Sequence, residues 1–200
     1  MSKQLIIVFV KNIKLGKVKT RLAKTIGNEG AFKVYKALVD ITEKATNAIA
    51  VEKHIYFSEV VITSKWEDSQ KEVQQGINLG ERMYNAFKKG FDAGYNNIVL
   101  VGSDLPDISE TIIQQGLDAL NKKEVVFGPA EDGGYYLIGL TAAHEFIFKN
   151  KPWSQPNLLK LTLEELKIQN LEYTLLDTLN DIDTFEDLKK SPLFKTFNYD

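Results

Sequence analysis

Short apolar runs alternate with amphipathic stretches along this chain. Runs rich in Val, Ile, Leu, Phe and Tyr predict buried β-strands, which we expect near residues 5–10, 53–58, 98–103, 125–128, 135–140 and 172–176. Between these runs, apolar residues recur at the three- and four-residue spacing of an α-helix, which predicts helices over residues 28–50, 80–93, 109–121, 156–169 and 184–190.

This regular order of strand and helix is typical of an α/β protein. It predicts a Rossmann-like, doubly wound, mostly parallel sheet flanked by helices. The segment 135–140 follows two glycines and can instead pair antiparallel at an edge, which would make the sheet mixed. Because residues 1–200 contain no internal repeat and no low-complexity linker, we expect a single domain.

Composition narrows the class of protein. With 44% hydrophobic and 26% charged residues, the chain can bury a packed core. The net charge of −2 argues against nucleic acid as a partner. The absence of cysteine excludes disulfides, thiolate zinc sites, iron–sulfur clusters and cysteine nucleophiles. The first apolar run is too short for a signal sequence or a membrane span, so we expect a cytoplasmic protein.

One candidate site follows the expected strand at 98–103. Gly102, Ser103 and Asp104 end that strand abruptly. In open α/β sheets ligands collect at the carboxyl ends of strands, and a carboxylate there is a hard ligand for Mg²⁺ or Mn²⁺ carrying a nucleotide diphosphate. The alternative is that Asp104 only shapes the turn, since Asp107 or Ser109 can cap the next helix.

A second candidate site lies between the expected strands at 125–128 and 135–140. Glu131 and Asp132 stand next to Gly133 and Gly134, and glycines allow a ligand to approach main-chain N–H groups closely. Asp132 would then face the ligand and position or deprotonate an acceptor. The alternative is a tight turn with a solvated Glu-Asp tip.

The first strand leads into a strongly basic loop. Its five cations are Lys11, Lys14, Lys17, Lys19 and Arg21. A nucleotide pyrophosphate supplies the missing counter-charge, with Lys19 and Arg21 neutralising the leaving diphosphate. The alternative is a solvated surface turn. The loop is neither a Walker A motif nor a Gly-x-Gly-x-x-Gly fingerprint, so NAD and FAD are not expected. The remaining expected nucleotide-binding residues are Lys11, Gly16, Lys17, Thr20, Arg82, Gly133 and Gly134.

Together these motifs resemble the DUF2064 family over almost the whole chain. The segments that carry the resemblance are Phe9–Lys11, Gly16–Leu22, Leu79–Met83, Gly102–Pro106, Gly128–Gly139, Trp153-Ser154 and Asp181–Leu188. The resemblance implies a GT-A, nucleotide-diphospho-sugar transferase fold and a glycosyltransferase of the type linked to arsenosugar biosynthesis. The chain departs from the family pattern where Ile13-Lys14-Leu15 replace a proline-containing stretch and where Leu105 replaces a cysteine.

The resemblance also implies a role for the acids near the C-terminus. The pattern Asp181-Ile182-Asp183-Thr184 recurs in related nucleotidyltransferases, such as molybdopterin cytidylyltransferases and phospholactate guanylyltransferases, where an acid of this region joins the metal site. Residues two apart share one face of an extended segment, so Asp181 or Asp183 can join Asp104 at the metal. Equally, Asp183 or Thr184 can cap the next helix.

We therefore expect a Mg²⁺- or Mn²⁺-dependent glycosyltransferase that uses a nucleoside-diphosphate sugar and a small-molecule acceptor. The alternative is a nucleotidyltransferase that joins a nucleoside triphosphate to a phosphorylated small molecule and releases pyrophosphate. A third possibility, from a different class, is a nucleotide-binding sensor without catalytic turnover.

Overall fold

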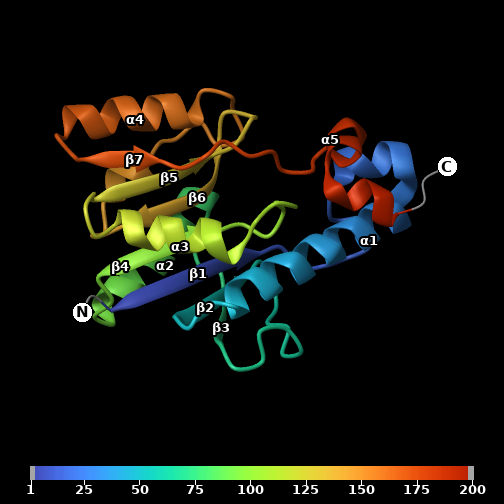
Figure 1. The fold of residues 1–200 in the computed structure, drawn as a ribbon, viewed down its shortest axis with the longest axis horizontal. Helices are drawn as coiled ribbons and strands as arrows, with labels where there is room; N and C mark the ends of the chain where they lie inside the picture. The colour runs from blue at the N-terminus through green and yellow to red at the C-terminus, as the bar shows by residue number, and fades with distance from the viewer. Residues whose placement is uncertain (1–2, 198–200) are drawn as a thin grey trace.

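The computed structural model describes residues 3–197 and confirms the predicted α/β class (Figure 1). One seven-stranded sheet has the order β3-β2-β1-β4-β6-β5-β7. Its strands are β1 (Gln4–Val10), β2 (Glu52–Phe57), β3 (Gln70–Val73), β4 (Asn97–Val101), β5 (Val125–Pro129), β6 (Tyr135–Leu140) and β7 (Tyr173–Leu175). All neighbours run parallel except β6, which is antiparallel to both β4 and β5.

Helices cover both faces of the sheet. They are α1 (Thr20–Asn47), α2 (Leu79–Asp92), α3 (Glu110–Ala119), α4 (Leu158–Ile168) and α5 (Phe185–Lys190), with 3₁₀ turns η1 (Glu145–Ile147) and η2 (Pro192–Thr196). Alternate residues of β1 face opposite sides: Ile6 and Val8 pack into the apolar layer under α1, α3 and α5. Leu5 and Ile7 pack into the layer under α2, α4 and η1. The buried central strands are therefore apolar on both faces.

The structure corrects three details of the prediction. The first helix begins at Thr20 rather than near residue 28, because two helical segments meet at a kink where Gly27 has φ 76°. The strand β3 has a polar, half-exposed sequence at the sheet edge and was not predicted. The strand β6 is antiparallel as suggested, but it lies inside the sheet rather than at its edge.

The last part of the chain crosses the molecule. From β7, the segment 176–184 runs to α5, which packs with η2 against the start of α1 (Figure 1). It therefore brings the C-terminal acids to the carboxyl ends of the parallel strands. Within residues 3–197 no helix combines the length and apolarity that a membrane crossing requires.

Candidate functional site

A cavity of about 600 Å³ opens at the carboxyl ends of β1 and β4. Its walls also include the start of β6, part of α2 and the segment before α4. The predicted site residues that line it are Lys11, Arg82, Asp104, Asp132, Gly134 and Asp181. This position agrees with the rule that ligands of open α/β sheets lie outside the carboxyl ends of the strands.

An acidic cluster surrounds Lys19 at the rim of this cavity. The Lys19 ammonium lies 3.0 Å from Asp183 Oδ1, 3.3 Å from Asp104 Oδ2 and 3.9 Å from Asp181 Oδ2. Its side chain is only 6% exposed. Burial alone would lower the pKa of Lys19, but the three carboxylates, Asp104 foremost, outweigh burial and raise that pKa well above its usual range. Lys19 is therefore held as a cation.

The same cluster carries more negative charge than Lys19 neutralises. Burial, and then repulsion from Asp104, raise the pKa of Asp181 to about 7. Asp183 and Asp132 add to the repulsion, and only Lys19 opposes it. An additional cation between these carboxylates would therefore be favourable.

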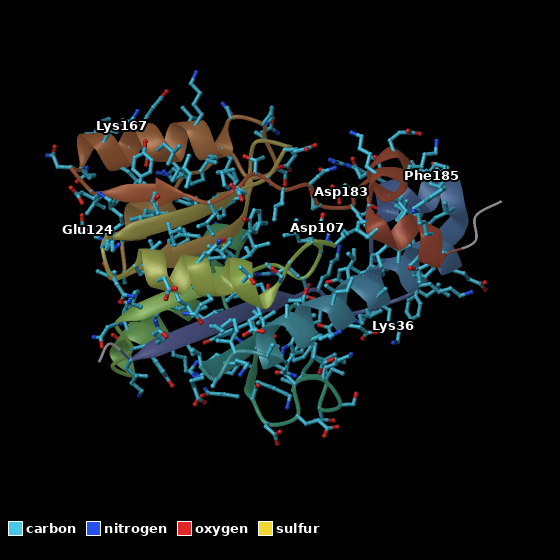
Figure 2. All side chains as sticks on the ribbon, in the orientation of Figure 1. Lys36, Asp107, Glu124, Lys167, Asp183 and Phe185 are labelled. Atoms are coloured by element: carbon cyan, nitrogen blue, oxygen red, sulfur yellow. The ribbon has the colours of Figure 1, made fainter. Side chains whose placement is uncertain are left out.

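The segment 176–184 delivers two of these acids. Its Leu179 N–H donates to the carbonyl of Pro129, and its buried Ile182 donates to the carbonyl of Asp104. Asp181 and Asp183 flank Ile182, and both face Lys19, as the two-residue spacing predicted. In Figure 2, Asp183 lies on this segment between α5 and the loop where Asp107 is labelled.

The alternative roles in helix capping fall to other residues. Thr184 caps α5, and its hydroxyl accepts from the backbone N–H of Asp187 in a capping box. Ser109 caps α3, so the helix after Asp104 does not need that carboxylate as its cap. The carboxylates of Asp104 and Asp183 therefore cap no helix. Both pair with Lys19, and both can bind a ligand at this position.

The turn that carries Asp132 is fixed by its two glycines. Gly133 has φ 88°, and a Cβ added to it would lie 1.9 Å from the Pro156 carbonyl oxygen. The carbonyl of Gly133 accepts from the backbone N–H of Leu159, while Asp132 Oδ1 accepts from Gly134 N–H at 2.8 Å. We predicted that a ligand would approach the backbone closely at Gly133. In the structure the loop before α4 makes this close approach.

Gly133→Ala is expected to destabilise the protein by more than about 2 kcal/mol, because it adds a clash to left-handed strain. The matched control is Gly94→Ala: Gly94 has φ 84°, but an added Cβ meets nothing within 4 Å. The control should lose only the left-handed penalty of about 1–2 kcal/mol. Urea unfolding of both variants measures the difference, and equal losses would show that Pro156 does not restrict this turn.

The basic loop does not act as one unit. Lys14 pairs with Glu59 at 2.5 Å, and Arg21, which is 70% exposed, pairs with Asp183 at 3.3 Å. Lys11 lines the cavity, whereas Gly16, Lys17 and Thr20 do not. Gly16 has φ 72°, which supports the prediction that it lets the loop fold. Of the loop's cations, Lys11 therefore lies at the cavity and Lys19 and Arg21 at the acidic cluster, whereas Lys14 pairs with Glu59.

Tyr35 is a site residue that the sequence pattern did not identify. Its hydroxyl contacts the Lys11 N–H at 3.0 Å, the Lys11 carbonyl at 3.1 Å and the Ser103 hydroxyl at 2.9 Å. Burial, the largest cause, raises the pKa of Tyr35 to about 12. Tyr35 thus ties the end of β1 to the loop after β4. Its position on the apolar stripe of α1 made it indistinguishable from a core residue.

Asn12 was also missed, and it joins the end of β1 to the loop after β2. Its side-chain oxygen accepts from the backbone N–H groups of Glu59 and Val60, and its amide donates to the Val60 carbonyl. A buried asparagine with this many partners rigidifies the rim of the cavity. The only signal in the sequence was a polar residue directly after a strand.

The donor set at the rim suits a hard divalent cation. Carboxylate oxygens are the ligands that Mg²⁺ and Mn²⁺ prefer, and burial together with repulsion from Asp104 raises the pKa of Asp181. In residues 3–197, no three acidic or histidine side chains form a ready metal-binding group. Lys19 lies among these carboxylates and neutralises part of their charge. A bound metal ion would neutralise part of that charge in its place.

Known proteins share this fold over most of their length. The chain is similar to a Desulfovibrio desulfuricans G20 crystal structure described as a "putative nucleotide-diphospho-sugar transferase", with 34% identity and a TM-score of 0.90; the match covers 100% of this chain and 89% of that one. The inositol-1-phosphate CTP transferase from T. maritima is 13% identical with a TM-score of 0.59, covering 94% of this chain and 91% of that chain, and shows the fold alone.

A curated relative is also similar in sequence. The 2-phospho-L-lactate guanylyltransferase of Methanocaldococcus vulcanius is 26% identical over 192 residues, covering 91% of this chain and 82% of the relative. The family described as "Uncharacterized protein conserved in bacteria (DUF2064)" matches residues 42–155, which is more than half of the chain. The chain therefore belongs to the DUF2064 family, as its motifs predicted, and has a nucleotide-diphospho-sugar transferase-like fold.

Proposed function

We propose that this protein is a Mg²⁺- or Mn²⁺-dependent nucleotidyltransferase that joins a nucleoside triphosphate to a small-molecule acceptor. The observation that supports this proposal is the acidic cluster around buried Lys19. At one rim of the cavity it offers carboxylates that can hold a metal, and a cation that can bind phosphate. Guanylyl transfer by the curated relative supports nucleotidyl transfer over the glycosyl transfer that the motifs first suggested.

In the proposed complex the triphosphate lies between the basic rim and the acidic cluster. Asp104, with Asp181 or Asp183, would hold the metal, which when bound would offset charge on the phosphates. Lys19 and Arg21 would turn from the carboxylates to the phosphate oxygens. Lys11 and Arg82 line the part of the cavity next to β1 and α2, where they would contact the nucleotide.

The reaction forms one bond and breaks another at the α-phosphorus. The acceptor oxygen attacks this phosphorus, the bond to the bridging oxygen breaks, and pyrophosphate leaves with that bond's electron pair. Asp132 lines the cavity beside the proposed phosphate position and would take the proton of the acceptor hydroxyl.

A second candidate is glycosyl transfer from a nucleoside-diphosphate sugar. The description of the structure that is 34% identical favours it. Asp132 would then deprotonate an acceptor that attacks the anomeric carbon, and a nucleoside diphosphate would leave.

Product analysis separates these candidates. The protein is incubated with Mg²⁺ or Mn²⁺ and each nucleoside triphosphate or nucleotide sugar, together with acceptor candidates. Release of pyrophosphate supports nucleotidyl transfer, and release of a nucleoside diphosphate supports glycosyl transfer. Metal-dependent nucleotide binding, detected as a raised melting temperature, with no product from any combination would favour the sensor.

Lys19→Met and Arg21→Ala are each expected to weaken binding of nucleoside triphosphates far more than binding of the bare nucleosides. Charge-assisted hydrogen bonds contribute about 1.5–3 kcal/mol, which corresponds to roughly a 10- to 150-fold change in Kd. Calorimetric titration measures both ligands. The control is Lys24→Ala, an exposed cation on the same helix. Equal weakening for triphosphate and nucleoside would contradict a phosphate role.

A further inference from the structure

Lys19 contacts the same carboxylate oxygens that a metal ion at the acidic cluster would need. Its ammonium donates to Asp183 Oδ1 at 3.0 Å and to Asp104 Oδ2 at 3.3 Å, and Asp181 Oδ2 lies 3.9 Å away. A divalent cation binds such oxygens directly and repels a neighbouring ammonium. Lys19 and a metal held by these acids would therefore compete for the cluster.

The backbone around Lys19 keeps its side chain at the cluster. Lys19 directly precedes α1 and has φ 45° and ψ 50°, a left-handed conformation that a non-glycine residue adopts at a cost. Its carbonyl accepts from the Ala23 N–H at 2.9 Å, and Val18 and Leu22 on either side are buried in the core. The ammonium can therefore leave the carboxylates only by rotation of its own side chain.

A displaced Lys19 would need another anionic partner. The side chain is only 6% exposed, so an unpaired ammonium there would lack both water and counter-charge. Within residues 3–197 its ion-pair partners are the three acids of the cluster. The first turn of α1 contains no acidic side chain, and no side-chain hydrogen bond caps it. Its backbone N–H groups favour an anion, so a phosphate group next to Lys19 can supply the missing partner.

Arg21 differs from Lys19 in its position and not in its charge. Its Nη1 lies 3.3 Å from Asp183 Oδ2, and in the described part of the chain Asp183 is its sole ion-pair partner. The Arg21 side chain is 70% exposed, so water solvates the guanidinium when this pair breaks. Arg21 is therefore a matched control for a role that depends on the buried position of Lys19.

We propose that Lys19 closes the acidic cluster to a divalent metal until a phosphate group binds. The inference rests on the proposed function and specifies how its binding steps are regulated. The metal alone binds weakly, because it would leave Lys19 buried without a counter-charge. With phosphate present, Lys19 turns to the phosphate oxygens and frees Asp104 and Asp183 for the metal. Metal and phosphate therefore bind as a coupled pair.

Binding of Mn²⁺ without any phosphate tests this closure directly. The electron paramagnetic resonance signal of free Mn²⁺ gives its affinity for each protein, and circular dichroism establishes that each variant is folded. Lys19→Met should bind Mn²⁺ at least about tenfold more tightly than the unaltered protein, since repulsion between neighbouring cations is of that order even in bulk water. Arg21→Met should change the affinity by less than about threefold. No gain in Lys19→Met, or equal gains in both variants, would overturn the proposal.

A double variant locates the Mn²⁺ that Lys19→Met gains. Adding Asp104→Asn to Lys19→Met should remove the gain, because both substitutions then act on one site. A gain that persists would place the ion elsewhere and overturn the proposal.

The unaltered protein offers a test that needs no substitution. Mn²⁺ and inorganic pyrophosphate together should raise its melting temperature by more than the sum of the two separate rises, and additive rises would overturn the proposal. These outcomes are separate from the proposed function. Closure by Lys19 without product from any nucleoside triphosphate would refute nucleotidyl transfer alone. Pyrophosphate release by a protein whose Mn²⁺ affinity is the same with and without Lys19 would refute the closure alone.

Discussion

Asp104→Asn is expected to abolish metal-dependent nucleotide binding. In the proposed complex Asp104 supplies a charged oxygen to the divalent cation, and an amide oxygen is a much weaker ligand for Mg²⁺ or Mn²⁺. At a nucleotide concentration of 100 times Kd, binding stabilises the unaltered protein by about 2.7 kcal/mol. A loss of affinity of about 100-fold or more would remove nearly all of this stabilisation.

The same substitution should leave the metal-free protein almost unchanged. The Asp104 side chain is 44% exposed, and Lys19 keeps its closer partner, Asp183. Melting curves with and without Mn²⁺ and nucleotide measure both effects, and Asp107→Asn in the exposed part of the same loop is the control. Undiminished metal dependence would exclude Asp104 as a ligand. A large loss of stability without metal would indicate that Asp104 shapes the turn.

Local sequence was sufficient to predict where the cavity lies. The buried run of β4 stops at Gly102, and the glycine pair at 133–134 marks the turn between β5 and β6. Strand ends of this kind are local features, because apolar runs and turn residues act over a few positions. The helix of α1 was located less well, since its apolar stripe does not reveal the kink at Gly27.

The partners of the charged residues could not be predicted in this way. Lys19 pairs with Asp183, which is 164 residues away in the chain, and no periodicity reports a contact of that range. The cations of the basic loop were predicted to bind phosphate, but nearby acids neutralise part of their charge. The partner of Gly133 proved to be Pro156 for the same reason: the docking of one loop on another depends on tertiary packing.

The acidic cluster should also make stability depend on pH. The pKa of Asp181 is about 7 in the folded protein, against roughly 3.9 for an unfolded aspartate. Between these two values the folded state binds a proton that the unfolded state has released. The free energy of unfolding therefore falls as pH rises from about 4 to about 7, by up to roughly 4 kcal/mol, and this contribution is constant above that range.

Asp181→Asn is expected to remove this fall and to stabilise the metal-free protein by about 2–4 kcal/mol at pH 8. A neutral amide avoids both the cost of burying a charge and the repulsion from Asp104. The side chain is only 20% exposed, so solvent screens these effects weakly. For a chain of this size the melting temperature should rise by about 4–16 °C at pH 8, and the two proteins should converge near pH 4. Thermal unfolding in EDTA from pH 4 to pH 8 measures the difference in melting temperature between the two proteins. Groups that titrate alike in both proteins do not contribute to this difference. Parallel pH profiles would show that burial and repulsion do not raise the pKa of Asp181, and the proposal that a metal ion binds at the cluster would then lose its electrostatic support.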